Sequence, residues 1–487
     1  MQFKNKVQLI TYPDSLGGNL TNLEHVLDTY FPDSFQGGVH ILPPFPSSGD
    51  RGFAPLTYTE IAPEFGSWND ISRIGKKYPI ALDLMVNHIS AQSIYFNDFL
   101  KNGERSPYKD MFITLDKIWP DAIPKQQDLE KIYLRRDVPF STYTSADGKP
   151  VTVWTTFGPE NPSEQVDLDI HSSVTKKILR EFLENFGKYH VSLVRLDAVG
   201  FVNKVAGTSC FFLEPEIYNF IDDMHDIAAQ AGIKLLPEVH AHYEINFKLA
   251  QHGCFAYDFC LPYLILNALL NKTSGALCDY LKRRPKGMIT MLDCHDGIPV
   301  KPDLDGLYVS GEAKRVAEIC ASQGADFSRL RTASQKDPDG FDVHQICCTY
   351  YSALGCNDDL YIAARALQLF SPGIPQVYYV GLLAGINDPH GVEISGDRRA
   401  LNRHNYTLEE IALAVKQPVV QRLMRLIDYR NSQIEFDGDF ETEQSGCSII
   451  CLRWNKDGHS SSLNVDLLNG KTTLIREHQG CKEEIVL

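Results

Sequence analysis

The sequence predicts an α/β protein built on a (β/α)8 barrel, with one insertion after the third strand, another after the seventh, and a small antiparallel β domain at the C-terminus. Three observations lead to this fold class. Eight short runs are rich in β-branched and aromatic residues, amphipathic segments lie between most of them, and after residue 434 the apolar residues alternate at period two.

The eight runs have the length and composition of strands. They are residues 6–12, 37–45, 80–86, 191–197, 233–239, 254–259, 288–293 and 374–381. Segments such as "SSVTKKILREFLENFGKY" have the apolar spacing of helices. Eight strand–helix units fit a closed barrel. An open doubly wound sheet is the alternative, but no G-x-G-x-x-G follows the first run.

Two intervals are too long for ordinary connections between a strand and its helix. Residues 87–167 follow the third strand, and residues 294–357 follow the seventh. Active sites of such barrels lie at the carboxyl ends of the strands, so we expect both insertions to shape a substrate site. The barrel itself would then comprise residues 1–86, 168–293 and 358–434.

The C-terminal part has a different pattern. "CSIICLRW", "SSLNVDLL" and "KTTLIREH" alternate apolar and polar residues, and Asn-Gly lies between the last two. Asn-Gly is typical of a tight hairpin turn. Residues 435–487 are therefore predicted to form an antiparallel β domain.

Charge and cysteine content exclude several classes of function. The formal net charge of −15 is unfavourable for binding nucleic acid or an anionic membrane. We expect no membrane helix and no signal peptide, because there is no run of 18 apolar residues and no apolar core in "MQFKNKVQLITYPDS". The twelve cysteines form no C-x-x-C pair, which favours reduced thiols in the cytoplasm. We expect no cofactor and no metal, since His240 and His242 lack a third ligand nearby.

Charged residues lie at the ends of several predicted strands. Arg195 and Asp197 point to the same face of a strand, and burying them is costly unless they are paired. Alone, this pair fits a structural ion pair. Strand ends also carry Asp83 and Glu238, and "LDCHDG" carries Asp296. Clustered carboxylates raise one another's pKa, which a fold tolerates most readily where chemistry uses it.

Four motifs then point to a family. "DLMVNH", "VRLDAVG", "LLPEVH" and "LDCHDG", in this order, resemble the four signature regions of the α-amylase family, glycoside hydrolase family 13. "KNKVQLITYPDSLGG", "PGIPQVYYVGLLAG" and "NRHNY" resemble its sucrose phosphorylase subfamily, over nearly the whole chain. "LRRDVPFSTY" and "DGFDVHQI" are more similar to members that act on sucrose 6F-phosphate, and His344 stands where plain sucrose phosphorylases carry Tyr.

The resemblance implies a mechanism. Asp197 would be the nucleophile and Glu238 the general acid and base, while Asp296 would stabilise the transition state. Double displacement would convert sucrose 6F-phosphate and phosphate into α-glucose 1-phosphate and fructose 6-phosphate. Retention predicts that the Asp197 and Glu238 carboxyl groups lie about 5–5.5 Å apart. Arg195 would pair with Asp197, keep it ionised and hold its orientation.

The resemblance also implies binding residues for the sugar. These substrate contacts are Asp50, His88, Phe157, Gln165, Arg195, His240, His295, Asp342, Gln345 and Arg403. Within this set, His88 and His295 would donate to glucose hydroxyls, and Asp50 and Arg403 would close the far end of the glucose pocket.

A phosphate beside carboxylates needs cations, since two charges about 4 Å apart repel by roughly 4 kcal/mol at a dielectric of 20. Arg135, Arg136 and His344 are the candidates. Two adjacent arginines more often form a solvated pair, and one of the two usually points away, so Arg135 is ranked first. Phe201 replaces a Tyr that is frequent in related enzymes, which leaves the acceptor contacts open.

Three other functions remain open. A plain sucrose phosphorylase would share every catalytic residue. An α-glucoside hydrolase would differ in the access of water to the intermediate. A non-catalytic amylase-like binding module would be expected to lack a carboxylate and to carry a membrane anchor. The expected partners are small molecules, and the chain is expected to be a monomer or a homodimer.

Overall fold

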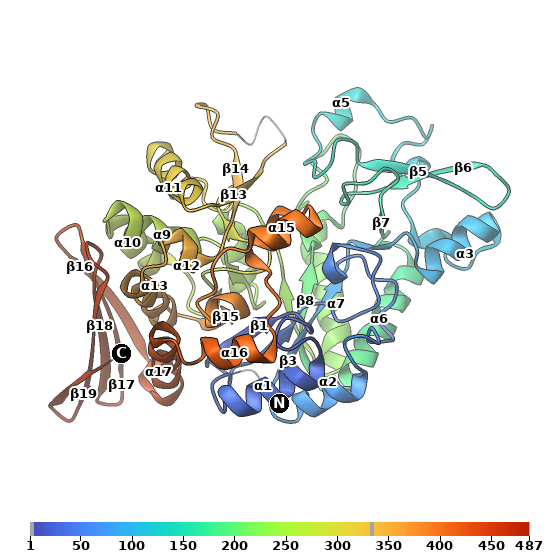
Figure 1. The fold of residues 1–487 in the computed structure, drawn as a ribbon. Coiled ribbons are helices and arrows are strands. Elements are labelled where there is room, and N and C mark those ends of the chain that lie inside the picture. The colour runs from blue at the N-terminus through green and yellow to red at the C-terminus, as the bar shows by residue number, and fades with distance from the viewer. Residues whose placement is uncertain (1–3, 332–335, 487) are drawn as a thin grey trace. The chain divides into compact units, whose positions relative to one another are not determined.

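The structure is a computed structural model that describes residues 4–331 and 336–486. Figure 1 shows its labelled helices and strands. The chain divides into two compact units. One spans Ile41–Val239, and the other joins the chain up to His40 to the chain from His240 onward. The four parts predicted from the sequence, with their boundaries, stay a prediction.

Three parallel strands form the sheet of the unit 41–239. They are β3 (Ile80–Met85), β8 (Val191–Asp197) and β9 (Lys234–Pro237). Every residue of β3 and β8 is buried, as expected of parallel strands covered on both faces. The register places Asp83 beside Arg195 and Met85 beside Asp197, so charged side chains enter a buried sheet at adjacent positions.

Helices cover this sheet because their apolar residues recur at helical spacing. The main ones are α2 (Trp68–Gly75), α6 (Ser173–Lys188) and α7 (Glu216–Gln230). At the start of α6, the Ser172 hydroxyl accepts hydrogen bonds from two backbone N–H groups of the first turn. The buried face of α6 includes Leu179, Phe182 and Phe186.

The segment after β3 contains two small antiparallel sheets. β4 (His88–Ser90) pairs with β7 (Gln165–Asp167), and β5 (Phe140–Thr144) pairs with β6 (Pro150–Trp154). The helices here are α3 (Ile94–Asn102), α4 (Leu115–Ile118) and α5 (Gln126–Leu129). Trp119 and Trp154 stack with ring centroids 6.1 Å apart in a small apolar core of this segment.

The other unit holds the remaining strands of barrel type. β10 (Tyr257–Asp258), β11 (Ile289–Thr290), β15 (Ile374–Tyr378) and β1 (Gln8–Thr11) are successive parallel neighbours. The boundary between the units falls in β2 (Gly38–Ile41). The helices of this unit are α1 (Leu20–Tyr30), α8 (Tyr243–Gln251), α9 (Leu261–Asn271), α10 (Gly275–Arg283), α12 (Tyr350–Ala353), α13 (Asp358–Phe370), α14 (Tyr379–Leu382), α15 (Pro389–Ser395), α16 (Leu408–Ala414) and α17 (Pro418–Ser432).

The segment after β11 forms a separate sheet. Its strands are β12 (Ile298–Pro299), β13 (Asp326–Arg329) and β14 (Val343–Cys347), with β14 antiparallel to both others. Helix α11 (Ser310–Ser322) lies between β12 and β13 in the chain. The segment "GFDVHQ" (residues 340–345) was expected to be a loop, but Val343, His344 and Gln345 lie within β14.

The C-terminal sheet is an antiparallel meander. It runs through β16 (Asp439–Ser445), β17 (Ile449–Lys456), β18 (His459–Asp466), β19 (Lys471–His478) and β20 (Cys481–Ile485). The Trp454 indole N–H donates to the Phe370 carbonyl oxygen at 2.7 Å, which joins the sheet to α13. The antiparallel C-terminal β structure is thus confirmed.

All eight predicted barrel strands are present, but β10 and β11, with two residues each, are much shorter than predicted. β11 ends at Thr290, whereas the apolar run continues to residue 293. The chain beyond it is held by side chains instead of a ladder, because Asn402 and Arg403 donate to the carbonyl oxygens of Cys294 and His295, both at 2.8 Å. Over residues 4–331 and 336–486, no helix is long and apolar enough to span a bilayer.

Candidate active site

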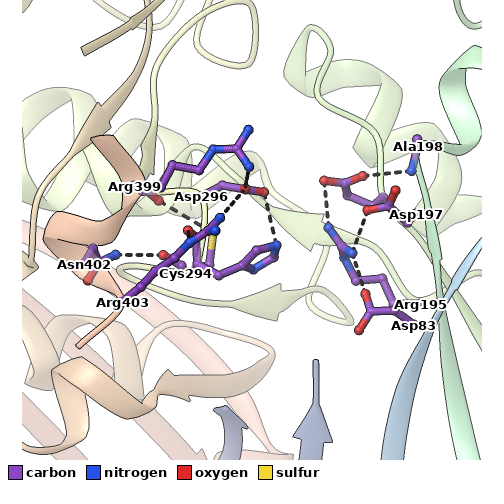
Figure 2. A network of polar contacts seen from close by, with 12 residues as sticks. Asp83, Arg195, Asp197, Ala198, Cys294, Asp296, Arg399, Asn402 and Arg403 are labelled. Atoms are coloured by element: carbon purple, nitrogen blue, oxygen red, sulfur yellow. Dashed lines mark hydrogen bonds and ion pairs between the residues drawn. The ribbon is translucent and has the colours of Figure 1, made fainter. Parts of the chain in front are cut away.

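One guanidinium group organises the carboxylates of the unit 41–239. Arg195 Nη1 donates to Asp83 Oδ1 and, at 2.9 Å, to Asp197 Oδ1, and Nη2 lies 2.9 Å from Glu238 Oε1. Figure 2 shows Arg195 between Asp83 and Asp197. Asp83 lies in β3, Arg195 and Asp197 lie in the neighbouring β8, and Glu238 directly follows β9, the next parallel strand. The predicted pairing of Arg195 with Asp197 is therefore present.

The backbone after Asp197 is strained. Ala198 has φ +53° and ψ +25°, in the left-handed region that residues other than glycine rarely adopt. This conformation aims the Ala198 N–H at Glu238 Oε2, 3.1 Å away. Such strain costs about 1–3 kcal/mol and persists where the surrounding structure over-determines it, typically at functional sites. The turn thus fixes Glu238 relative to Asp197.

Three buried carboxylates contact one guanidinium, that of Arg195. Asp197 and Glu238 both accept from it, so these two carboxyl groups are held side by side. A double displacement at a sugar needs such a pair of neighbouring carboxyl groups, one as the nucleophile and one as the general acid.

A second group of predicted residues lies on β4, β7 and the loops beside them. His88 Nε2 lies 3.0 Å from the Phe53 carbonyl oxygen, and the rings of His88 and Phe157 lie 5.4 Å apart. Burial lowers the pKa of His88, and the negative charge of Asp167 opposes this only in part, so His88 is neutral at pH 7. Gln165 is buried and donates to the same carbonyl oxygen at 3.4 Å.

The fourth predicted residue of this group is Asp50. It opens the short helix Asp50–Gly52 and has φ +47°. Its negative charge contributes to raising the pKa of Glu164, after the larger effect of partial burial.

The two adjacent arginines have different surroundings. Arg136 is buried and donates to the hydroxyls of Ser141 (3.1 Å) and Thr155 (3.0 Å) and to the Glu160 carbonyl oxygen (2.8 Å). Arg135 lies over the Phe157 ring, with its guanidinium carbon 5.8 Å from the centroid. The contacts of Arg136 favour a structural role for it, which agrees with ranking Arg135 first. Phosphate binding by either residue stays a prediction.

Asp296 lies in the other unit, where two guanidinium groups contact it. Arg399 Nη1 and Arg403 Nη2 lie 3.2 and 3.6 Å from Asp296 Oδ1, and His295 Nε2 lies 3.4 Å from Oδ2. Figure 2 shows both arginines reaching Asp296. Arg403 also lies over the Tyr12 ring at 5.8 Å. The predicted residues His295, Asp296 and Arg403 are therefore in mutual contact.

A buried ion pair fixes the chain just before Asp296. Arg365 Nη2 contacts Asp293 Oδ1 at 2.9 Å, and both side chains are fully buried. Gly381 is required here, because a Cβ on it would lie 1.8 Å from Arg365 Nη2. The absence of a side chain at Gly381 thus makes room for the ion pair that holds the chain after β11.

His344 and His240 lie together in the same unit. Their ring centroids are 5.9 Å apart, and His240 Nδ1 lies 3.3 Å from Asp303 Oδ2. His344 Nδ1 contacts the Lys301 carbonyl oxygen, so this nitrogen carries the proton of the neutral ring. Nε2 can then donate to an anion only when the ring is protonated.

The two other predicted acceptor residues flank His344. Gln345 is buried in β14. Asp342 pairs with Arg329 (2.5 Å) and Lys336 (3.2 Å), and although partial burial raises the pKa of Asp342, these cations lower it overall.

The residue types here could also hold a metal ion. Ligand atoms of Cys294, His295 and Asp296 lie within 4.8 Å of one another. However, Arg399 and Arg403 already contact the Asp296 carboxylate, and a cation there would be repelled by two guanidinium groups. These contacts do not favour a metal site.

Two charged residues were not among the predicted site residues. They are Arg399, which contacts Asp296, and Lys204, which contacts Asp167. Arg399 follows another arginine in "GDRRALNRHN", and its distance from the Asp296 motif in the chain conceals the contact. Lys204 is a single lysine in the apolar run "AVGFVNKVAG", and an isolated charge in such a run was the available signal.

Comparisons with known proteins agree with this geometry. The family model "Alpha amylase, catalytic domain" matches residues 30–248. A sucrose 6(F)-phosphate phosphorylase from Thermoanaerobacterium thermosaccharolyticum is 56% identical over 475 residues, which cover 97% of both chains. A sucrose phosphorylase from Streptococcus mutans is 43% identical over 472 residues, 96% of both chains.

The structural comparison extends over the whole chain. The crystal structure of a sucrose 6F-phosphate phosphorylase from Thermoanaerobacter thermosaccharolyticum matches with a TM-score of 0.98 and 55% identity, covering 100% of this chain and 99% of that one. This match and the observed strands confirm the predicted fold class, a (β/α)8 barrel with a C-terminal antiparallel β domain. The chain belongs to the sucrose phosphorylase family of α-amylase-type enzymes.

Proposed function

We propose that the chain is a retaining glucosyl phosphorylase that acts on sucrose 6F-phosphate. One observation carries the proposal. A single guanidinium, that of Arg195, contacts both Asp197 and Glu238 in a chain 56% identical to a sucrose 6(F)-phosphate phosphorylase. Carboxyl groups about 5–5.5 Å apart give retention, and shared contact with one guanidinium supports such a separation.

The first displacement uses both carboxyl groups of this cluster. An Asp197 carboxylate oxygen attacks the anomeric carbon, while Glu238 transfers its proton to the departing fructosyl oxygen. The bond from glucose to fructose breaks, a glucosyl–Asp197 ester forms, and Glu238 is left ionised. The contact with Arg195 and the Ala198 N–H stabilise Glu238 in that ionised form.

The second displacement reverses these roles. Glu238 removes a proton from inorganic phosphate, whose oxygen attacks the same anomeric carbon and releases Asp197. Two inversions give α-glucose 1-phosphate. Asp296 would stabilise the positive charge that develops on the sugar ring, by its place in the family motif "LDCHDG".

The remaining predicted residues would hold the sugars. His88, His295, Asp50 and Arg403 would bind glucose hydroxyls, with Phe157 and Gln165 lining the same pocket. His240, Asp342 and Gln345 would serve the fructosyl part. Neutral His88 suits this role because glucose carries no charge.

Recognition of the 6-phosphate would rest on Arg135 and His344. Arg135 offers several N–H donors in a fixed fork. His344 donates to the phosphate through Nε2 only as an imidazolium, because Nδ1 faces the Lys301 carbonyl oxygen. A tyrosine at position 344 would donate one hydrogen bond but supply no charge.

Action on unphosphorylated sucrose is the second candidate, supported by the 43% identity to a sucrose phosphorylase. The test measures glucose 1-phosphate release from both substrates with inorganic phosphate. We expect a higher kcat/KM with sucrose 6F-phosphate. A preference for sucrose would instead favour the second candidate, and release of free glucose would indicate a hydrolase.

A substitution at position 344 sharpens this test. His344→Tyr should lower kcat/KM for sucrose 6F-phosphate by roughly tenfold or more, since one charge-assisted hydrogen bond is worth about 1.5–3 kcal/mol. Its effect on sucrose should be smaller. Equal losses on both substrates would contradict the proposed role of His344. We also propose a cytoplasmic location, which fits the presence of all twelve cysteines as thiols.

A further inference from the structure

We propose that Lys204 is a positioning residue for the candidate active site, and that its ammonium group ties the His88 strand to the turn that follows Asp197. The inference rests on the proposed function for its kinetic readout. Lys204 has no role in the two displacements described above, yet its side chain is only 1% exposed.

The ammonium group of Lys204 is fully coordinated by oxygen atoms. Nζ lies 2.8 Å from Asp167 Oδ2 and 2.8 Å from Asn87 Oδ1, and it donates to the Phe201 carbonyl oxygen. An ammonium has three N–H donors, and here each has an acceptor. The three acceptors come from segments that lie far apart in the sequence.

Asp167 is the centre of this network. Its side chain is fully buried, and it accepts from the Thr156 N–H (2.8 Å), the Thr156 hydroxyl and Asn87 Nδ2 (3.1 Å). A buried carboxylate is costly unless a cation pairs with it, and Lys204 supplies that cation.

The network reaches two parts of the candidate site. Asn87 directly precedes His88, which lies opposite Asp167 in the pairing of β4 with β7. Phe201 ends the short helix Val199–Phe201, which begins after strained Ala198 and therefore just after the proposed nucleophile.

Ring contacts also join the turn after Asp197 to His88. Phe201 packs on Phe157 with centroids 5.1 Å apart, and Phe157 packs on His88 at 5.4 Å. Loss of the ammonium would therefore release the nucleophile turn and the proposed glucose contact together. A displacement of about 1 Å between such groups costs roughly 10²-fold in rate.

Kinetics on two variants separate positioning from charge neutralisation. Lys204→Met keeps the apolar stem and removes the ammonium, and we expect kcat to fall by about 100-fold. The double variant Lys204→Met/Asp167→Asn removes both charges, so its melting temperature should recover while kcat stays low. Wild-type kcat in the double variant would overturn the proposal, because Lys204 would then only neutralise Asp167.

Chemical rescue tests the hydrogen bonds themselves. In Lys204→Ala, added methylammonium should restore part of kcat with saturation, since it can donate to the same three oxygens. Tetramethylammonium has the charge but no N–H donor and should not restore it. Equal rescue by both ions would overturn the proposal.

A matched lysine provides the control. Lys117 pairs with Asp169 at 2.8 Å in the same unit but lies nearer the solvent. Lys117→Ala should leave kcat within about twofold, since partly exposed ion pairs contribute little. A kcat for Lys204→Met as close to wild type as that of Lys117→Ala would overturn the proposal.

Amide hydrogen exchange keeps the test independent of the proposed function. Residues 86–90 and 198–204 should both exchange faster in Lys204→Met than in wild type, whether or not the protein acts on either sugar. Unchanged exchange in both segments would overturn the proposal that Lys204 holds them together. An inactive wild-type protein would instead refute the proposed function alone.

Discussion

The carboxylates around Arg195 and the carboxylate of Asp296 are held in opposite ways. Asp83, Asp197 and Glu238 contact the same guanidinium, whereas Asp296 contacts two, those of Arg399 and Arg403. Arg403 also lies 3.5 Å from Asp397.

The difference separates reactive carboxylates from a fixed one. Asp197 and Glu238, the proposed nucleophile and the proposed acid and base, depend on one shared guanidinium for their relative position. Two arginines hold the orientation of Asp296. The contrast predicts that substitutions in the first group affect chemistry and stability strongly, and that substitutions around Asp296 affect them less.

The largest effect is expected for Asp197→Asn. This change keeps the shape of the side chain but removes the nucleophile, so kcat should fall by about 10⁴-fold or more, which corresponds to roughly 5.5 kcal/mol. The measurement is glucose 1-phosphate release, with the melting temperature as a control for folding. Residual activity above about 1% of wild type would be inconsistent with the role of Asp197.

The second effect concerns stability. Arg195→Gln would remove the guanidinium that three buried carboxylates contact, and the free energy of unfolding should fall by about 3–5 kcal/mol at pH 7. Denaturant unfolding measures it. A loss below about 1 kcal/mol would show that the three carboxylates need no common cation.

The same contrast explains how much of the site could be predicted from the sequence. Arg195 and Asp197 are two residues apart in one strand, and the period of a strand puts them on one face. Asp83 lies within β3 and Glu238 directly follows β9, and the parallel sheet places these strands on either side of β8. The Arg195 group was therefore predictable from local pattern and topology.

The surroundings of Asp296 were less accessible to such reasoning. Arg399 is about a hundred residues further along the chain, on a short helix whose placement depends on the packing of several loops. Lys204 lies in a turn with no periodicity, and only tertiary packing directs it to Asn87 and Asp167. The short β11 was likewise not predictable, since an apolar run does not reveal where side-chain contacts replace a ladder.

A smaller effect is expected from the protonation of His88. Burial lowers the pKa of His88 below its ordinary value of 6.5, so the unfolded chain binds this proton more readily than the folded protein. Stability should therefore be highest above pH 6.5 and decrease as the pH falls from there toward the lowered pKa. Unfolding of wild type and His88→Asn across this range tests it, and the variant should show a weaker pH dependence. Identical slopes would indicate that His88 does not titrate as proposed.

The smallest effect is expected for Arg399→Gln. The Arg399 side chain is 31% exposed, whereas that of Arg403 is 4% exposed and also donates to the His295 carbonyl oxygen. Solvent weakens the Arg399 contact, so the free energy of unfolding should change by less than about 1 kcal/mol, with a modest rise in KM. Arg403→Gln should have a larger effect on both. Arg399→Gln could instead lower the free energy of unfolding as much as Arg195→Gln. That result would contradict the distinction between the Arg195 group and Asp296.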